Sequence, residues 1–352
     1  MQFLDDSLLP ENQDKLVITV APYGPEWEPS DFPEDIPVSM DEQVQKAVDC
    51  YNAGATVLHM HVREPDGTGS KRLSMFNEML SRLREAVPDM ILQVGGSISF
   101  APEGEGAEAK WLSDDTRHML AELTPRPDQV TIAVNTTQMN IMDLMSDEEY
   151  GQTSLARSDL YHAYREMVVP AGPGWVEEHL RRLQANQIQP HFQLTCMPDL
   201  ETVERLVRRG NYTGPLNITW VGIGGGFDGP NPNNIMEFIR RTPDGACLTL
   251  ESVMRNCLPV NTLAIAMGLH VRCGIEDTIW GERKQKITSV EQIEQLVRIS
   301  EELGRPVASG KEARAIYRIG DWYADADETL TQNGMAPNRR QGEKSVPLRR
   351  AS

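Results

Sequence analysis

The sequence predicts an α/β protein of the (β/α)8 TIM-barrel class, a single domain with a C-terminal extension. Eight short apolar, β-branched runs recur along the 352 residues, and helix-like stretches follow most of them. Alternating strands and helices form right-handed βαβ units, and eight units within about 300 residues favour a closed barrel over an open sheet. The sequence contains no repeat, low-complexity run or linker that would separate two domains. We expect the barrel over residues 1–320 and the extension over residues 321–352.

The predicted strands are short runs rich in Val, Ile, Leu and Thr, the composition of strands in a parallel sheet that is covered on both faces. In chain order they are 16–21, 56–62, 90–94, 129–134, 191–195, 216–221, 246–250 and 269–273. Two irregular stretches, 97–111 and 222–234, follow strands, where the active-site loops of a barrel lie.

Helix signals lie between these runs. Capping boxes at Ser39, Thr288 and Ser309 predict three helix starts, and Gly54 and Gly210 are placed to end two helices. Helical spacing of apolar residues supports the remaining segments. The predicted helices are 40–53, 73–86, 175–185, 200–209, 261–268, 289–303 and 313–319.

Composition and charge exclude several functional classes. A formal net charge of −18 argues against binding to nucleic acid or to an anionic membrane. No apolar run approaches the roughly 18 residues that span a bilayer, and the first residues do not resemble a signal peptide. The five cysteines are scattered without a CxxC pair, which is typical of reduced thiols. We therefore expect a cytoplasmic protein that acts on small molecules.

The pair His59 and His61 is the strongest chemical signal. Residues i and i+2 of a strand point to the same face, so both imidazoles should face the barrel interior at the end of the second strand. Two imidazoles suit Zn²⁺, with a carboxylate or another histidine as third ligand. The alternative is a pair of histidines that make structural hydrogen bonds.

The third ligand should come from another strand end. Glu276 follows the eighth strand, which lies near the second in a closed barrel, and Asp277 and Arg272 could form an ion pair beside the metal. A solvated loop is the alternative. Weaker candidates are Thr131, which could point inward from the fourth strand, and residues 95–97, whose N–H groups could bind a carboxylate or simply form a turn.

Four segments of the chain carry a family pattern. They are residues 59–67 (HMHVREPDG) with Ala53–Gly54–Ala55 before them, 268–277 (GLHVRCGIED), 303–308 (LGRPVA) and 312–314 (EAR). In order and at compatible spacing over residues 15–320, they resemble the signatures of the β-keto acid cleavage enzymes, whose type member is the 3-keto-5-aminohexanoate cleavage enzyme.

The resemblance implies a zinc-dependent barrel that converts a β-keto acid and acetyl-CoA into acetoacetate and a new acyl-CoA. It also implies a homo-oligomer, with a tetramer favoured. The residues it assigns are His59, His61 and Glu276 as zinc ligands, Arg272 and Asp277 as the general-base dyad, and Glu26, Ser97 and Thr131 as substrate contacts.

The sequence departs from the family pattern at several places, among them the strand-six loop, where 224–228 (GGGFD) stands in place of a common Pro-Gly-Gly form. Gly95 stands in place of a serine, with Ser97 two places on, and Ala133 stands in place of an asparagine. Glu26 and Glu28 hint at a substrate with a cationic tail, although a solvated loop explains them nearly as well.

Two other functions are compatible with the His59 and His61 pair. One is a zinc-dependent barrel hydrolase with a metal-activated water, and the other is a barrel that binds a ligand or metal without catalysis. Such hydrolases usually carry the pair on strand one, with further histidines on strands five and six. This sequence has the pair on strand two and His191 near the start of strand five.

Overall fold

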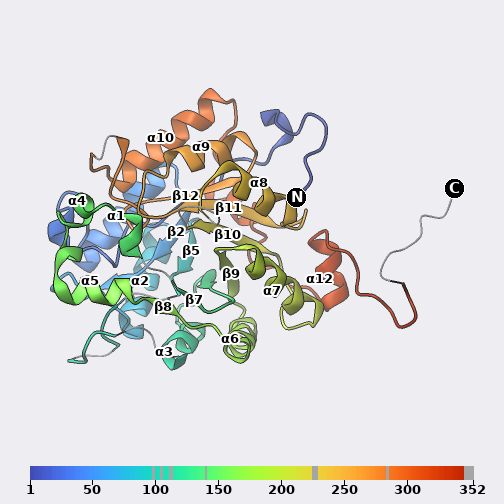
Figure 1. Cartoon of the computed structure of the whole chain (residues 1–352), viewed down its shortest axis with the longest axis horizontal. Coiled ribbons are helices and arrows are strands. Elements are labelled where there is room, and N and C mark those ends of the chain that lie inside the picture. The colour runs from blue at the N-terminus through green and yellow to red at the C-terminus, as the bar shows by residue number, and fades with distance from the viewer. Residues whose placement is uncertain are drawn as a thin grey trace.

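The computed structural model describes residues 1–96, 100–103, 106–110, 114–138, 141–223, 229–282 and 285–344. Its centre is a closed barrel of eight parallel strands, surrounded by helices (Figure 1). The strands are β1 (Ile18–Val20), β2 (Val57–Met60), β5 (Ile91–Val94), β6 (Gln129–Ile132), β9 (Gln189–Leu194), β10 (Asn217–Gly222), β11 (Cys247–Ser252) and β12 (His270–Cys273). They pair in the order β1-β12-β11-β10-β9-β6-β5-β2, which confirms the predicted (β/α)8 barrel.

The strands occupy the predicted runs, with differences at their ends. The second predicted strand divides after Met60, because Val62–Arg63 (β3) pairs with Gly69–Ser70 (β4) in a separate antiparallel hairpin. The fifth strand begins at Gln189, two residues earlier than predicted. Pro190 lies within it and pairs in register with Val130 of β6, near the start of the strand where a missing N–H is tolerated.

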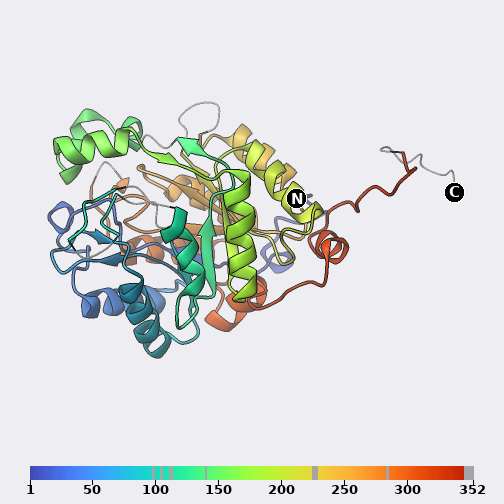
Figure 2. The same ribbon diagram turned by 90° about the horizontal axis from the view of Figure 1, so that it is seen from below.

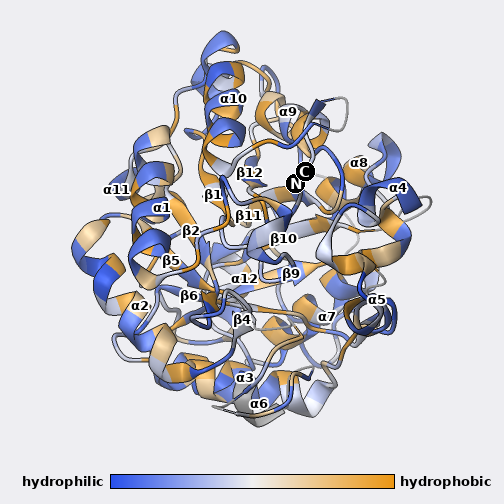
Figure 3. Ribbon diagram, turned by 90° about the vertical axis from the view of Figure 1, so that its left-hand side faces the viewer, coloured by the Kyte–Doolittle hydropathy of each residue, from blue (hydrophilic) through white to orange (hydrophobic). Residues whose placement is uncertain are grey.

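All seven predicted helices are present, and the structure adds others. The helices are α1 (Met40–Ala53), α2 (Leu73–Ala86), α3 (Asp114–Met119), α4 (Asp147–Tyr150), α5 (Ser158–Arg165), α6 (Pro173–Ala185), α7 (Met197–Arg208), α8 (Pro232–Arg241), α9 (Leu258–Ala266), α10 (Ser289–Glu302), α11 (Gly310–Ile316) and α12 (Ala326–Gln332). Those around the barrel carry both hydrophobic and hydrophilic residues along their length (Figure 3). No helix in the described part of the chain is long and apolar enough to cross a membrane.

Helix α8 shows why some elements escaped prediction. It begins at the end of the stretch 222–234, which the sequence predicted to be irregular because Pro and Asn are frequent there. Those residues start the helix instead: the Asn231 side chain accepts a hydrogen bond from the Asn234 N–H, and Pro232 occupies the first helical position.

A long excursion between β6 and α6 covers one side of the barrel mouth. It contains β7 (Thr137–Gln138), α4, α5 and β8 (Val168–Val169), and β7 pairs with β8. Figures 1 and 2 both show α4 and α5 together, on the side away from the C-terminal segment. Their apolar residues join Trp27, Ile275 and Trp280 in a second hydrophobic cluster, apart from the main core of the barrel. Buried Asp31 anchors the excursion by accepting hydrogen bonds from Ser154 N (2.6 Å) and Oγ (2.5 Å).

The segment after residue 320 begins by packing on the barrel. Helix α12 contacts α7, and Asn333 is fully buried. The Asn333 side chain accepts from Leu216 N and donates to Gly214 O, just before β10 begins. Beyond α12 the chain extends away from the body of the molecule (Figures 1 and 2). The predicted boundary at residue 320 stays a prediction.

Candidate active site

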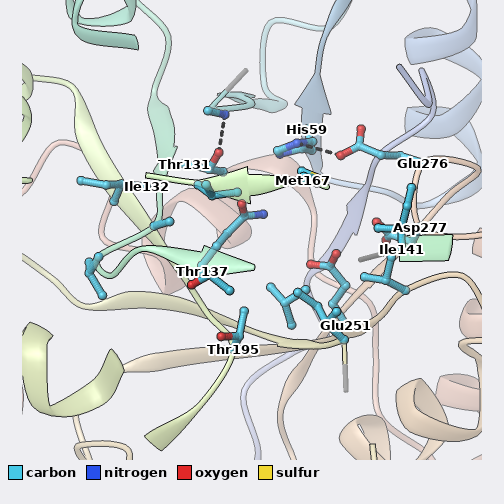
Figure 4. Close-up of a pocket in the computed structure, with 18 of the residues that line it drawn as sticks. His59, Thr131, Ile132, Thr137, Ile141, Met167, Thr195, Glu251, Glu276 and Asp277 are labelled. Carbon is cyan, nitrogen blue, oxygen red and sulfur yellow. Dashed lines mark hydrogen bonds and ion pairs between the residues drawn. The ribbon is translucent and has the colours of Figure 1, made fainter. Parts of the chain in front are cut away.

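A pocket of about 1150 Å³, open to solvent, lies at the carboxyl ends of the barrel strands. The end residues of β2, β6, β9, β10, β11 and β12 line it, and the excursion supplies Ile141, Tyr164, Met167 and Val169 from the side. Figure 4 shows His59 and Glu276 pointing toward each other across it. Its position matches the end of the barrel where enzymes of this fold keep their chemistry.

The structure brings together His59, His61 and Glu276, the three predicted metal ligands. The Nε2 atoms of the two histidines lie 3.2 Å apart, and the Glu276 carboxylate lies 3.2 Å from His59 Nε2 and 3.6 Å from His61 Nε2. One ligand atom from each residue falls within 4.8 Å of the others. Two imidazoles and a carboxylate form a donor set that suits Zn²⁺.

Gln93, on β5, fixes the orientation of the His59 ring. Its Oε1 accepts a hydrogen bond from His59 Nδ1 at 2.8 Å, and its Nε2 donates to Gln129 Oε1 at 3.0 Å. The proton is therefore on Nδ1, and the lone pair of Nε2 faces the pocket. Burial, followed by the charge of Arg272, lowers the pKa of His59 to about 4, so the ring is neutral at neutral pH.

Arg272, at the end of β12, lies close to three carboxyl groups. Its Nη2 donates to Glu276 Oε1 (2.8 Å) and to Asp277 Oδ1 (2.7 Å), and its Nε donates to Asp277 as well. Glu251, at the end of β11, places Oε2 3.3 Å from the same Nε. The predicted pair of Arg272 and Asp277 thus exists in the pocket, with a third acid that the sequence did not indicate.

The carboxyl groups around Arg272 differ in their affinity for a proton. Burial raises the pKa of Glu251 well above its usual range, while the attraction of His59, His61 and Arg272 outweighs burial and holds the pKa of Glu276 well below it. Burial also raises the pKa of Asp277, and Glu251 hydrogen-bonds with it. Glu251 therefore carries a proton toward Asp277, and Glu276 stays ionised for a cation.

The comparisons with known proteins identify the family of this chain. The family model for the beta-keto acid cleavage enzyme matches residues 15–319. This chain belongs to the beta-keto acid cleavage enzyme family. The match confirms the family resemblance that the four sequence segments indicated.

Curated relatives and solved structures extend the comparison. The chain is 27% identical over 310 residues to the 3-keto-5-aminohexanoate cleavage enzyme of Acetoanaerobium sticklandii, covering 87% of this chain and 99% of that protein. It is 26% identical over 315 residues to the 3-oxoadipate:acetyl-CoA acetyltransferase of Cupriavidus necator, covering 88% and 96%. The fold resembles the ternary complex of ObcA with C4-CoA adduct and oxalate, with TM-score 0.56, 11% identity, and coverage of 80% of this chain and 67% of that one.

Among the expected substrate contacts of this family member, Thr131 and Glu26 line the pocket and Ser97 lies outside the described residues. Thr131 Oγ1 accepts a hydrogen bond from Gly96 N at 2.7 Å (Figure 4). Glu26 Oε2 is buried without a hydrogen-bond partner among the described residues. Burial and the neighbouring charge of Glu276 raise the pKa of Glu26 to about 8.

Arg63, within the first family segment, explains how Glu26 is held. Its guanidinium donates to four backbone carbonyls, those of Tyr23, Gly24, Trp27 and Gly67, and is 2% exposed. Three of these belong to the loop after β1 that carries Glu26. The sequence showed Arg63 only as part of a polar run, because its partners are carbonyl groups that leave no trace in side-chain identity.

Glu28, unlike Glu26, is not among the residues that line the pocket. Glu28 precedes the short helix Pro29–Asp31, and its carboxylate pairs with Arg157 of the excursion. The hint of a cationic substrate tail therefore rests on Glu26 alone. His191 faces the barrel core with its Nε2 2.7 Å from Thr219 Oγ1, and Cys273 is a fully buried core residue.

Proposed function

We propose that this chain is a zinc-dependent β-keto acid cleavage enzyme that uses acetyl-CoA as co-substrate and yields acetoacetate and a new acyl-CoA. The observation that carries the proposal is the meeting, in one pocket of a family member, of His59, His61 and Glu276 with the Arg272 and Asp277 pair. The relatives named above as a cleavage enzyme and an acetyl-CoA acetyltransferase support this type of reaction.

The three ligand side chains fit a divalent metal. Glu276 Oε2 is buried and has no hydrogen-bond partner among the described residues, and Gln93 keeps the His59 Nε2 lone pair available. A metal binds histidine through a neutral imidazole nitrogen, so the three ligands together would contribute the single negative charge of Glu276 to a dication. Zn²⁺ bound by them would act as a Lewis acid toward the ketone oxygen of the substrate and stabilise an enolate.

Asp277 supplies the base. The carbon between the ketone and the carboxylate loses a proton to the Asp277 carboxylate, which Arg272 holds in place with hydrogen bonds of 2.7–3.2 Å. The new carbanion bonds to the acetyl carbonyl carbon, and CoA leaves as the thiolate. CoA then attacks the former ketone carbon, the bond between this carbon and the acidic carbon breaks, and acetoacetate departs with the proton returned by Asp277.

Thr131 and Glu26 complete the substrate site in this proposal. Thr131 lines the pocket and would contact the substrate carboxylate, while its Oγ1 holds the backbone at Gly96. Glu26 offers a buried carboxyl group to a hydrogen-bonding group of the substrate.

Incubation of the zinc-loaded protein with a panel of β-keto acids and acetyl-CoA tests the proposal. Acetoacetate and a new acyl-CoA should appear together in equal amounts, and neither should form without acetyl-CoA. Release of free acid and CoA without acetoacetate would instead point to hydrolysis.

The hydrolase alternative is not favoured. The described residues that line the pocket include His59, His61 and His179, and His179 lies with Arg117 and Trp175, outside the three-ligand group. The additional histidine ligands that such hydrolases place on strands five and six are missing from this part of the chain.

A further inference from the structure

The pocket has a second end beside α3 and α6, which precede and follow β6, the strand across the closed barrel from β12. Arg117 of α3 and Leu120 line this end from one side, and Trp175 and His179 of α6 line it from the other. Residues 114–119 and 173–185 come from two connections that are far apart in the chain, yet α3 and α6 pack against each other. None of these residues has a part in the proposed chemistry.

Arg117 provides a fixed positive charge at this end. It is only 3% exposed, and its guanidinium carbon lies 3.8 Å from the centre of the Trp175 ring. His118 and His179 stack on the same indole, with ring centres 5.3 Å and 4.9 Å from it. Burial, then the neighbouring charges, lowers the pKa of His179 to about 3, so that ring adds no charge at neutral pH.

Further hydrogen-bond donors surround this charge. The Trp175 Nε1–H is buried and has no hydrogen-bond partner among the described residues. Trp175 is in the first turn of α6, and the N-cap residue of this helix, Gly172, makes no side-chain cap hydrogen bond. A guanidinium, an indole N–H and an uncapped helix start make a donor-rich site that suits an anion.

Much of the remaining pocket wall is apolar. Ile132, Ala133, Met167 and Val169 line it, and Figure 4 shows Ile132 on the side away from Glu276. A ligand that reaches both ends therefore has a polar head, an aliphatic middle and an anionic tail. Glu26, whose charge interacts with that of Glu276, belongs to the reaction end.

We infer that Arg117 and Trp175 form a tail subsite, and that the preferred substrate is a β-keto acid with a second carboxylate at its far end. The inference rests on the proposed function and adds a substrate class to it. A phosphate of CoA is the other anion that such donors could bind. The experiment therefore distinguishes a substrate carboxylate from a CoA phosphate.

The test compares β-keto diacids of six to eight carbons, beginning with 3-oxoadipate, with β-keto monoacids of equal length. The wild type should show a higher kcat/KM for the diacids. Arg117→Met should lower this preference about 10- to 100-fold through loss of charged hydrogen bonds, with the KM for acetyl-CoA unchanged. Arg117→Lys should keep part of the preference, and Arg181→Met, at a 66% exposed side chain on α6, should keep all of it.

A binding measurement keeps this inference separate from the proposed reaction. Adipate and suberate should raise the melting temperature of the wild type more than hexanoate and octanoate do, and Arg117→Met should abolish the difference. If no β-keto acid yields acetoacetate, the proposed function fails while this measurement still supports the subsite. Equal stabilisation by monoacids and diacids, or a raised KM for acetyl-CoA with unchanged diacid preference in Arg117→Met, would overturn it.

Discussion

Gly95 leaves no room for a side chain beside the two imidazoles. A Cβ atom at this position would lie 2.3 Å from His61 Nε2 and 3.0 Å from His59 Nε2. Gly95→Ala should therefore displace the His61 ring and lower the zinc content of the purified protein, which atomic absorption measures. Gly174→Ala is the control, because nothing lies within 4 Å of its Cβ. Full zinc content in Gly95→Ala would contradict the proposed ligand set.

The ligand and base roles predict different effects of two substitutions on zinc content, although both should lower turnover. His59→Ala removes one of three ligands and should lose both zinc and turnover. Asp277→Asn should keep zinc, yet lower kcat by about 10²- to 10⁴-fold, since the amide cannot accept the substrate proton. Zinc content and kcat measured on the same preparations decide both: retained zinc in His59→Ala, or unchanged turnover in Asp277→Asn, would remove that residue from the mechanism.

At the residue level, the sequence indicated the groups that carry charge or metal affinity within a motif. His59, His61, Glu276 and the Arg272 and Asp277 pair all belong to contiguous segments. Glu251 was not predicted, because it belongs to no recognisable motif. Its position directly after the predicted strand 246–250 was the one signal that could have indicated it. Its role arises from the neighbouring strand β12, which pairs with β11 only in the folded barrel.

At the level of elements, a buried acid helps to attach the excursion between β6 and α6 beside the β1 loop. Asp31, 3% exposed, accepts two hydrogen bonds from Ser154. Asp31→Asn replaces one acceptor by a donor and should destabilise this contact by about 1–3 kcal/mol. Hydrogen exchange should then quicken across residues 141–171.

Asp159→Asn provides the matched control for that substitution. Asp159 is an exposed acid on α5 of the same excursion, and it pairs with exposed Arg157. Exchange should remain at the wild-type rate in Asp159→Asn. The same unchanged rate in Asp31→Asn would show that other contacts hold the excursion.

The elements also show how far capping signals reach. The boxes at Ser39, Thr288 and Ser309 predicted three helix starts correctly. Ser146 and Glu149 form the same box, but it opens the four-residue helix α4, which has no buried residue. A cap stabilises a helix start, whereas the apolar face that follows decides whether the helix continues.

For the whole molecule, Asp128 ties the barrel to its helices at the end opposite the pocket. It accepts hydrogen bonds from Arg84 of α2 (2.9 Å), Arg314 of α11 (2.7 Å) and Leu92 N of β5 (2.9 Å). Burial alone would raise the pKa of Asp128, but these partners lower it below its usual range. Its contribution to stability is therefore present above the unfolded-state pKa of about 3.9 and is lost as the pH falls through the folded-state pKa.

Asp128→Asn should lower the free energy of unfolding at pH 7 by about 2–3 kcal/mol. The deficit should shrink as the pH falls below about 4, because the wild-type carboxylate then becomes neutral as well. Urea denaturation at pH 7 and at a pH below about 4 measures this deficit in the free energy of unfolding. Asp41→Asn, at an 87% exposed side chain, should match the wild type at both. A deficit in Asp128→Asn that does not change with pH would exclude the ion pairs as its cause.

The barrel fold was predictable because eight successive strand and helix patterns indicate the same architecture. An error in the boundary of one strand or helix does not alter that prediction. The excursion was not, since its helices are short and its apolar residues pack on Trp27, Ile275 and Trp280, from distant segments. The oligomeric state and the cytoplasmic location stay predictions.

The excursion supplies pocket-wall residues from a different part of the fold than the residues assigned to the reaction. The reacting groups lie on the barrel strands and the short segments that follow them, whereas Ile141, Met167 and Val169 of the pocket wall belong to a segment with its own apolar cluster. Libraries confined to these wall positions would explore new substrates while the chemistry and the barrel stay constant. Under the proposed function, such libraries would change which acyl-CoA is formed without altering the residues assigned to the reaction.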